Sequence, residues 1–255
     1  MAFDGITVAA VTKELNDKLT GGRVYKIAQP EEDALLLTIK TQNGQYRVLL
    51  SADASLPLVY LTDINKTSPM TAPNFCMVMR KHLQNARILG FSQPGLERIL
   101  RMDVEHLNEM GDLCRKTLVV EIMGKHSNII LIDEKDTIVD SIKHISGMVS
   151  SVREVLPGRP YFVAQTVEKE DPLLASSEDF LGNLQGKNMP ADRALMTCYM
   201  GISPQMASEI VRRADVDAQM DIQMLMQDPE SMSRLWQAFS QVMRCVKIGE
   251  FSPVV

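Results

Sequence analysis

Apolar positions recur along the first two thirds of the chain at the spacings typical of helices and strands. From Val8 to Leu19 they follow helical intervals, and a second amphipathic helix is predicted over Asn74–Arg87. Between and after these helices, runs rich in Val, Ile and Leu predict strands. These runs are Val24–Ile27, Ala34–Lys40, Tyr46–Leu50, Leu58–Thr62, Ile88–Phe91, Arg98–Val104, Cys114–Met123, Asn128–Asp133 and Thr137–Lys143. Short connections such as Asn43-Gly44 favour hairpins, so an α+β domain with mostly antiparallel pairing is predicted.

The last third of the chain has a different pattern. Pro157-Gly158 and Pro160 interrupt the extended segments, and residues 165–177 are acidic and loop-like. Short helical patterns follow, over Phe180–Leu184, Asp192–Tyr199, Pro204–Ala214, Ile222–Met226 and Ser231–Lys247. We therefore predict two domains, an α+β domain over residues 1–170 and a small all-α domain over residues 171–255.

Composition narrows the class of protein. With 255 residues, 45% of them hydrophobic, the chain is long enough for a substantial core. It has no uncharged apolar run of about 18 residues, so no membrane partner is expected. The N-terminus lacks the basic start of a signal peptide, and the four cysteines lie far apart without zinc-type spacing. These features predict a reduced, cytoplasmic protein without a metal or cofactor.

Net charge is −5, yet the excess of acidic residues lies after residue 160. The middle third is rich in both signs, with cations near predicted turns. RNA binding needs a local basic surface and not a basic chain, so an RNA partner is permitted. Arg80 and Lys81 on the second helix, and Lys125 in a turn, are candidate phosphate contacts; a solvated helix flank is the alternative for the first two. His82 falls on the apolar face and is interpreted as a hydrogen-bonded core histidine.

The segment from Glu121 to Asp133, EIMGKHSNIILID, places a glycine-centred turn between two predicted strands. Strand alternation projects Glu121 to the same side as Val119 and Met123, with Ile122 on the other side. A carboxylate inside an apolar strand needs a partner or lies at a binding surface.

Arg98 is predicted to enter the apolar row of Leu100, Met102 and Val104, with Glu97 on the opposite face. An arginine in such a row is either a buried ion pair or a binding cation at the rim. The candidate partners are Glu121 and Asp4, although Asp4 is also placed to cap the first helix.

The turn Tyr199–Pro204 joins two predicted helices, with Ser203 as N-cap and Pro204 at the first helical position. This is a helix-hairpin-helix pattern, whose free backbone N–H groups can hold a phosphate. Ser203 occupies the place of the usual second glycine, and simple helix packing is the alternative. The chain has none of the P-loop, GxGxxG, HExxH and GxSxG motifs of common enzymes.

Six segments in the same order give the chain a resemblance to the NFACT family, the ribosome-associated quality-control factors called RqcH in bacteria and also fibronectin-binding protein A homologues. They are MAFDG at the start, GGRVYKIAQP at 21–30, FCMVMRKHL at 75–83, GLERIL at 95–100, EIMGKHSNIILID at 121–133 and GISPQMASEI at 201–210.

The resemblance implies an NFACT-N domain, similar to the N-terminal domain of formamidopyrimidine-DNA glycosylases, followed by a helix-hairpin-helix domain. It implies binding to large (50S) ribosomal subunits that hold an obstructed peptidyl-tRNA. It also implies recruitment of tRNA, alanyl-tRNA in bacteria, for mRNA-independent tailing of the stalled chain. The family's coiled coil and NFACT-R domain are absent from the sequence, so a fragment is expected.

The family's tRNA-handling Asp-Arg pair falls on Glu97 and Arg98, so this sequence differs by one methylene group. Asp4 matches an acidic residue of the family, and Glu121, Ile122 and Met123 fall on a further segment associated with tRNA binding. We expect Glu97 and Arg98 to form a charged rim that contacts tRNA, with Arg98 oriented by Asp4 or Glu121.

Two other functional classes stay open. The older family name suggests a fibronectin-binding surface adhesin, although nothing in the sequence directs export. Glycosylases of the resembled fold use an N-terminal proline nucleophile; here Met1 is followed by Ala2, Phe3 and Asp4, so a non-enzyme is expected.

Overall fold

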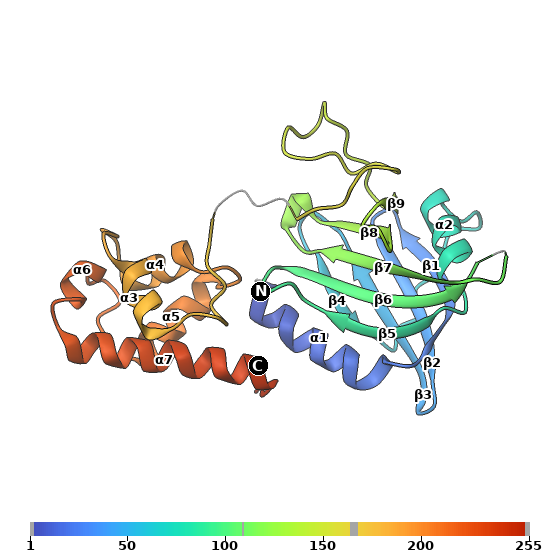
Figure 1. The fold of residues 1–255 in the computed structure, drawn as a ribbon. Helices are drawn as coiled ribbons and strands as arrows, with labels where there is room; N and C mark the ends of the chain where they lie inside the picture. Colours follow the sequence, from blue (N-terminus) through green and yellow to red (C-terminus); the bar gives the residue numbers. More distant parts are fainter. Residues whose placement is uncertain (1–2, 109, 164–167, 253–255) are drawn as a thin grey trace. The chain divides into compact units, whose positions relative to one another are not determined.

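The computed structural model describes residues 3–108, 110–163 and 168–252 and divides the chain into two compact units (Figure 1). The sheet unit comprises Val11–Gln93 and Ile99–Thr166. The helical unit comprises Met1–Ala10, Pro94–Arg98 and Val167–Val255. The helical unit thus takes in two early segments as well as the C-terminal third, and the division predicted at residue 170 did not include them.

The sheet unit contains one antiparallel sheet with the strand order β4-β3-β2-β1-β5-β6-β7-β8-β9. Its strands are β1 (Arg23–Glu31), β2 (Ala34–Thr41), β3 (Gly44–Ser51), β4 (Leu58–Leu61), β5 (Arg87–Ser92), β6 (Ile99–Leu107), β7 (Leu113–Glu121), β8 (Asn128–Asp133) and β9 (Ile138–Ser141). The predicted α+β class with antiparallel pairing is confirmed. Chain order and spatial order differ only where β5 joins β1 instead of β4.

Two helices precede strands of this sheet. Helix α1 (Gly5–Leu19) buries Leu15 and Leu19 completely. Helix α2 (Asn74–Leu83) packs against β1 through its apolar face, which includes Met79. The predicted helix over Asn74–Arg87 was four residues too long. The helix ends because Gln84 adopts an extended conformation, with a ψ of 125°. Asn85 follows with a φ of +62°, a left-handed conformation that asparagine tolerates better than most residues.

His82 of α2 is only half-buried, so its placement in the core was wrong. Its ring meets the ring of His106 edge-on, with centroids 6.2 Å apart. His106 lies on β6, and α2 contacts that strand as well as β1. The histidine therefore lies at the border of the packed face, where the apolar stripe of α2 meets solvent.

The helical unit contains α3 (Ser177–Leu184), α4 (Ala191–Cys198), α5 (Pro204–Arg213), α6 (Ile222–Leu225) and α7 (Pro229–Ile248). These helices agree with the predicted ones within a few residues at each end. Their caps are local: the Ser203 hydroxyl accepts the Met206 N–H at 3.2 Å at the start of α5, as predicted. Phe180, Tyr199 and Phe239 form the buried aromatic centre.

One face of β6–β9 is covered by the irregular segment that follows β9. Ile99, Val119 and Ile130 of the sheet form an apolar cluster with Val155 and Tyr161 of that segment. All five side chains are buried. This packing places the covering segment directly over the end of β7 that carries Glu121.

Within the described residues, no helix has both the length and the apolar composition needed to cross a membrane. The same part of the chain contains no cluster of His, Cys, Asp and Glu side chains suited to a metal ion.

Candidate functional site

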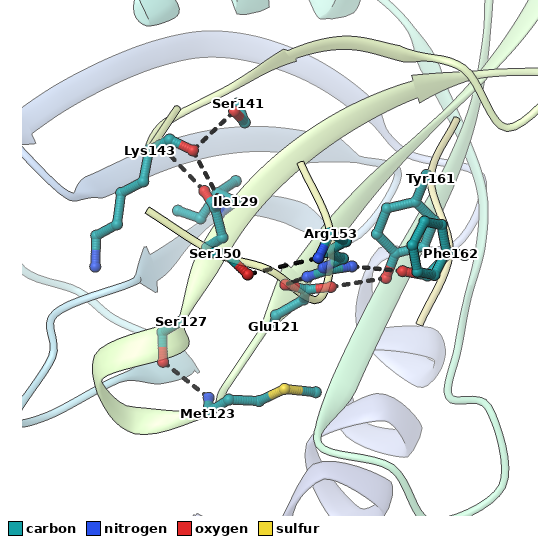
Figure 2. Close-up of polar contacts among 11 residues, drawn as sticks. Glu121, Met123, Ser127, Ile129, Ser141, Lys143, Ser150, Arg153, Tyr161 and Phe162 are labelled. Carbon is teal, nitrogen blue, oxygen red and sulfur yellow. Dashed lines mark hydrogen bonds and ion pairs between the residues drawn. The ribbon is translucent and has the colours of Figure 1, made fainter. Parts of the chain in front are cut away.

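Glu121 is the last residue of β7 and is 1% exposed. The chain then turns through a short 3-10 helix, η1 (Gly124–His126), and returns as β8. Gly124 adopts a φ of +59°, which glycine reaches without the steric cost that a side chain would add. The Ser127 hydroxyl accepts the Met123 N–H at 2.8 Å and closes the turn (Figure 2). The predicted strand-turn-strand arrangement is confirmed, and Glu121 lies on the apolar face with Val119.

The carboxylate of Glu121 binds two side chains of the covering segment (Figure 2). The Arg153 guanidinium forms an ion pair with Oε2, and the Tyr161 hydroxyl donates to Oε1 at 3.0 Å. Arg153 also donates to the Phe162 carbonyl oxygen, and its guanidinium lies 5.5 Å from the centre of the Tyr161 ring. We call Glu121, Arg153 and Tyr161 the buried triad.

The side chains of the triad are almost completely shielded from solvent. The side chains of Arg153 and Glu121 are 12% and 1% exposed. Burial, then the charge of Glu121 and its hydrogen bond, raises the pKa of the Tyr161 phenol well above its usual range. Tyr161 therefore stays a proton donor to Glu121 at neutral pH. A buried ion pair of this kind needs each partner, because either charge alone would be desolvated without compensation.

A second set of polar contacts anchors the start of the covering segment to the turn. The side-chain amide of Asn128 donates to the Lys143 carbonyl at 2.9 Å and accepts the Lys143 N–H at 3.1 Å. The Ser141 hydroxyl donates to the same carbonyl at 2.9 Å, and the Lys143 ammonium donates to the Ala52 carbonyl. Side chains of β8 and β9, together with that of Lys143 itself, thus fix the start of the covering segment.

Arg98 lies elsewhere than the sequence pattern predicted. Strand β6 begins at Ile99, so Arg98 precedes the strand and is exposed, while Leu100, Met102 and Val104 are buried as predicted. It has no hydrogen bond or ion pair with any residue in the described ranges. Glu121 pairs with Arg153 instead, so the prediction that Glu121 orients Arg98 was wrong.

Asp4 has partners other than Arg98. Its Oδ1 accepts the N–H of Thr7 at 2.8 Å and the hydroxyl of Thr7 at 2.9 Å, which is the N-cap arrangement that was its alternative role. Its Oδ2 accepts the Ser203 hydroxyl at 2.6 Å. The side chain is 9% exposed. Asp4 therefore joins the start of α1 to the start of α5 within the helical unit.

Three segments of the helical unit meet in backbone contact beside this hydrogen bond. The Gly5 N–H donates to the Gly201 carbonyl at 3.0 Å. A Cβ atom added to Gly5 or to Gly201 would lie 2.1 Å from the Leu96 carbonyl oxygen, well inside van der Waals contact. Leu96 is fully buried and directly precedes Glu97. We call Gly5, Leu96 and Gly201 the glycine contact.

The remaining candidate residues are distributed between buried and exposed positions. Ile122 is buried, Met123 is half-buried and Lys125 is exposed. Arg80 is half-buried, and its Nε donates to the Ile27 carbonyl at 3.0 Å, so part of its donor capacity holds α2 to β1. Lys81 is exposed.

The basic residues at the end of α5 are paired. Glu209 accepts from Arg212 at 2.7 and 2.9 Å and from Arg213 at 2.8 Å. These hydrogen bonds lower the pKa of Glu209 to about 2. Glu209 therefore compensates both cations at the C-terminal end of α5, which is opposite to the end that carries the hairpin turn.

No sequence pattern indicated Arg153 or Tyr161, which lie 32 and 40 residues from Glu121 in an irregular segment. The requirement that a buried carboxylate has a partner predicted that such residues exist, but not which ones.

The fold and these contacts define an α+β protein with an antiparallel sheet unit and a helical unit assembled from three parts of the chain. The chain belongs to the NFACT family, whose "NFACT N-terminal and middle domains" match residues 4–255. The predicted resemblance is confirmed.

The curated relatives include two bacterial RqcH proteins. The chain is 39% identical over 215 residues to the Rqc2 homolog RqcH of Bacillus subtilis, covering 84% of this chain and 38% of that protein. It is 36% identical over 218 residues to the Rqc2 homolog RqcH of Streptococcus suis, covering 85% and 39%. The chain thus spans about two fifths of the length of these relatives.

Two solved structures have a similar fold. The N-terminal part of the fibronectin/fibrinogen-binding protein from Streptococcus suis superposes with a TM-score of 0.80 at 32% identity, covering 94% of this chain and 85% of that one. The fibrinogen-binding protein from Staphylococcus aureus gives a TM-score of 0.80 at 30% identity, covering 97% and 83%.

Proposed function

We propose that this chain is the N-terminal and middle part of a cytoplasmic ribosome-associated quality-control factor. In this role it binds large ribosomal subunits that hold an obstructed peptidyl-tRNA. It recruits tRNA, alanyl-tRNA in a bacterium, so that the stalled chain gains a C-terminal tail without mRNA. The observation that carries the proposal is the 39% identity to the Rqc2 homolog RqcH over 84% of the chain. The role is one of binding and positioning, without an enzymatic step of its own.

The tRNA contact in this proposal is made by Glu97 and Arg98. Arg98 is exposed and has no ionic partner among the described residues, so its guanidinium is available to a phosphate or a base. Asp4, Glu121 and Ile122 are buried, and a supporting role suits them better than direct contact. The half-buried Met123 and Arg80 and the exposed Lys81 and Lys125 remain candidate RNA contacts.

The glycine contact supplies the support for Glu97 and Arg98. Leu96 is held between Gly5 and Gly201, and the next two residues carry the proposed tRNA site. The carboxylate of Asp4 fixes the same region through Ser203. Within the helical unit, the backbone that presents Arg98 is therefore held by packing from two other segments.

The presence of two compact units supports the two domains that the family implies. We assign the sheet unit to the NFACT-N domain, similar to the N-terminal domain of formamidopyrimidine-DNA glycosylases. We assign the helical unit to the helix-hairpin-helix domain. The turn with Gly201 at a φ of +73° and Ser203 as N-cap supports the second assignment.

The test is co-purification of the full-length protein from its own cells, with sequencing of the bound RNA. Wild-type protein should recover large-subunit rRNA and one enriched tRNA, and Arg98→Glu should lose the tRNA. Arg193→Glu, at another exposed arginine of the helical unit, is the charge-matched control. Both variants should melt like the wild type, because exposed substitutions change stability by about 0.5 kcal/mol or less. Recovery of neither RNA by the wild type would reject the proposal.

A second candidate is a surface adhesin, favoured by the names of the similar solved structures as fibronectin- or fibrinogen-binding proteins. Binding of fibronectin by intact cells, lost on deletion of the gene, would support that function. The absence of such binding, together with recovery of ribosomal RNA, would favour the quality-control role.

A further inference from the structure

Helix α1 leads into β1 at one end of the sheet (Figure 1). The strand register places a row of cations across neighbouring strands at that end. The antiparallel register pairs Lys40 of β2 with Arg23 of β1, and Arg23 with Arg87 of β5. It then pairs Arg87 with Glu105 of β6, and Glu105 with Arg115 of β7. Residues directly opposite each other in an antiparallel pair project to the same face. These five side chains therefore form one line, which we call the basic row.

Four of the five residues are cations, and all four are exposed. Glu105 is the one carboxylate in the row, and it accepts from Arg87 at 3.3 Å. Arg115 is exposed and has no hydrogen bond or ion pair among the residues that the structure describes. The chain as a whole carries a net charge of −5, so this concentration of positive charge opposes the average composition.

Arg23 and Arg87 are a like-charged pair of residues directly opposite each other on β1 and β5. Backbone hydrogen bonds run on either side of the pair, from Ile88 N–H to Gly22 and from Val24 N–H to Ala86. The two arginines thus form a non-hydrogen-bonded pair, in which Cα atoms lie about 4.5 Å apart. Like charges directly opposite each other destabilise a sheet. Their placement is explained when an anionic partner compensates the repulsion.

An exposed aromatic ring lies beside the row. Tyr25 is the extra residue at an irregularity of β1, and 49% of it is exposed. The Lys40 ammonium lies 3.4 Å from the centre of its ring. Cations that follow a phosphate backbone, next to an aromatic ring on which a base can stack, are the two components of sequence-tolerant RNA binding.

Two carboxylates lie near the other end of the row. Arg115 borders a polar cavity of about 510 Å³ whose wall includes Asp103 and Glu134. The Thr117 hydroxyl donates to Asp103 at 2.6 Å. The most positive part of the row is therefore the part formed by Lys40, Arg23 and Arg87.

We propose that the basic row, with Tyr25, binds the phosphodiester backbone of a folded RNA. Neighbouring strands are about 4.8 Å apart, so Lys40, Arg23 and Arg87 present three donors along one short path. This surface lies in the sheet unit, whereas Arg98 belongs to the helical unit. The identity of the RNA, either large-subunit rRNA or tRNA, rests on the proposed function.

The test measures RNA binding of the purified protein by fluorescence anisotropy across a series of salt concentrations. The probes are 50S subunits, total tRNA and an unrelated RNA duplex. The double variant Arg23→Gln/Lys40→Gln should bind at least about tenfold more weakly at 0.1 M salt. The slope of log affinity against log salt should fall by about 1.4 to 1.8 for two lost phosphate contacts. Lys13→Gln/Lys135→Gln removes two exposed cations of the same unit and should leave both quantities unchanged.

Arg23 also donates to the Asn85 carbonyl at 3.0 Å, so Lys40→Gln alone serves as a variant that loses no hydrogen bond to the backbone. It should lower the slope by about 0.7 to 0.9. Loss of 50S binding alone would identify rRNA as the RNA, and loss of tRNA binding alone would identify tRNA. Unchanged affinity and slope for every probe would overturn the proposal that the basic row binds RNA. That result is distinct from failure of the proposed function, in which wild-type protein recovers no rRNA or tRNA from cells.

Discussion

Replacing Glu121 by glutamine tests whether the buried triad holds the covering segment on the sheet. Glutamine keeps the size of the side chain but leaves the Arg153 charge without its counter-ion at a position where only 12% of that side chain is exposed. Breaking a buried ion pair from one side costs about 3 to 5 kcal/mol. The remaining amide oxygen still accepts a hydrogen bond, so we expect about 3 kcal/mol. In a chain of this size that loss lowers Tm by about 6 to 12 °C.

The assay is urea unfolding followed by two probes. Far-UV circular dichroism reports on the secondary structure of both units, and the fluorescence of Trp236, the single tryptophan, reports on the helical unit. The variant should shift the transition seen by circular dichroism. Adding Arg153→Met should restore most of the lost stability, because a neutral pair has no uncompensated charge.

The matched control is Glu31→Gln in the same unit. Glu31 pairs with Lys66 at 2.6 Å, but its side chain is 54% exposed, and surface pairs contribute about 1 kcal/mol or less. If Glu121→Gln shifts the midpoint no more than this control does, the triad does not stabilise the fold and the reasoning is refuted.

Three further predictions concern single substitutions. Gly201→Ala should destabilise the helical unit by about 3 kcal/mol or more, because Gly201 has a φ of +73° and the new Cβ would meet the Leu96 carbonyl oxygen at 2.1 Å. Tryptophan fluorescence during urea unfolding measures this loss, and an unchanged midpoint would contradict the glycine contact. Ser203→Ala should cost about 2 kcal/mol in the same assay, because it removes both the cap of α5 and a buried hydrogen bond to Asp4; Ser203→Thr should retain most of the stability. The raised pKa of Tyr161 means that its contribution to stability is complete below about pH 10, the phenol's unfolded pKa, and declines as pH rises further. Between pH 8 and 11 the free energy of unfolding should therefore fall more steeply for the wild type than for Tyr161→Phe. Parallel curves of this free energy against pH would exclude a contribution from the titration of Tyr161.

Local pattern was sufficient to predict most of the secondary structure. Apolar runs define strands because alternate residues must be buried, and Asn43-Gly44 fixes one hairpin without reference to the rest of the chain. The end of α2 was missed because it depends on the extended conformation of Gln84 and the left-handed conformation of Asn85, and the apolar pattern indicates neither. Arg98 was assigned to the core row because alternation was extended one residue beyond the start of β6.

Partners far apart in sequence could not be predicted in the same way. The burial of Glu121 followed from its apolar neighbours, but Arg153 reaches it from a segment without periodicity. Leu96 belongs to the helical unit because its backbone contacts two glycines. A glycine has no side chain that would contribute to a pattern of apolar and polar positions, so this contact could not be predicted from the sequence. Those contacts are determined by tertiary packing.

The hydrogen bond between Asp4 and Ser203 also has a consequence for synthesis, because its two residues are 199 positions apart. At about 5 to 20 residues per second, a ribosome needs roughly 10 to 40 seconds to go from one to the other. All the strands of the sheet are translated within that interval, whereas the first residues wait for α4 and α5. The N-terminal segment is thus the oldest part of the nascent chain and among the last to reach its final contacts, which leaves it open to chaperones longer than any strand.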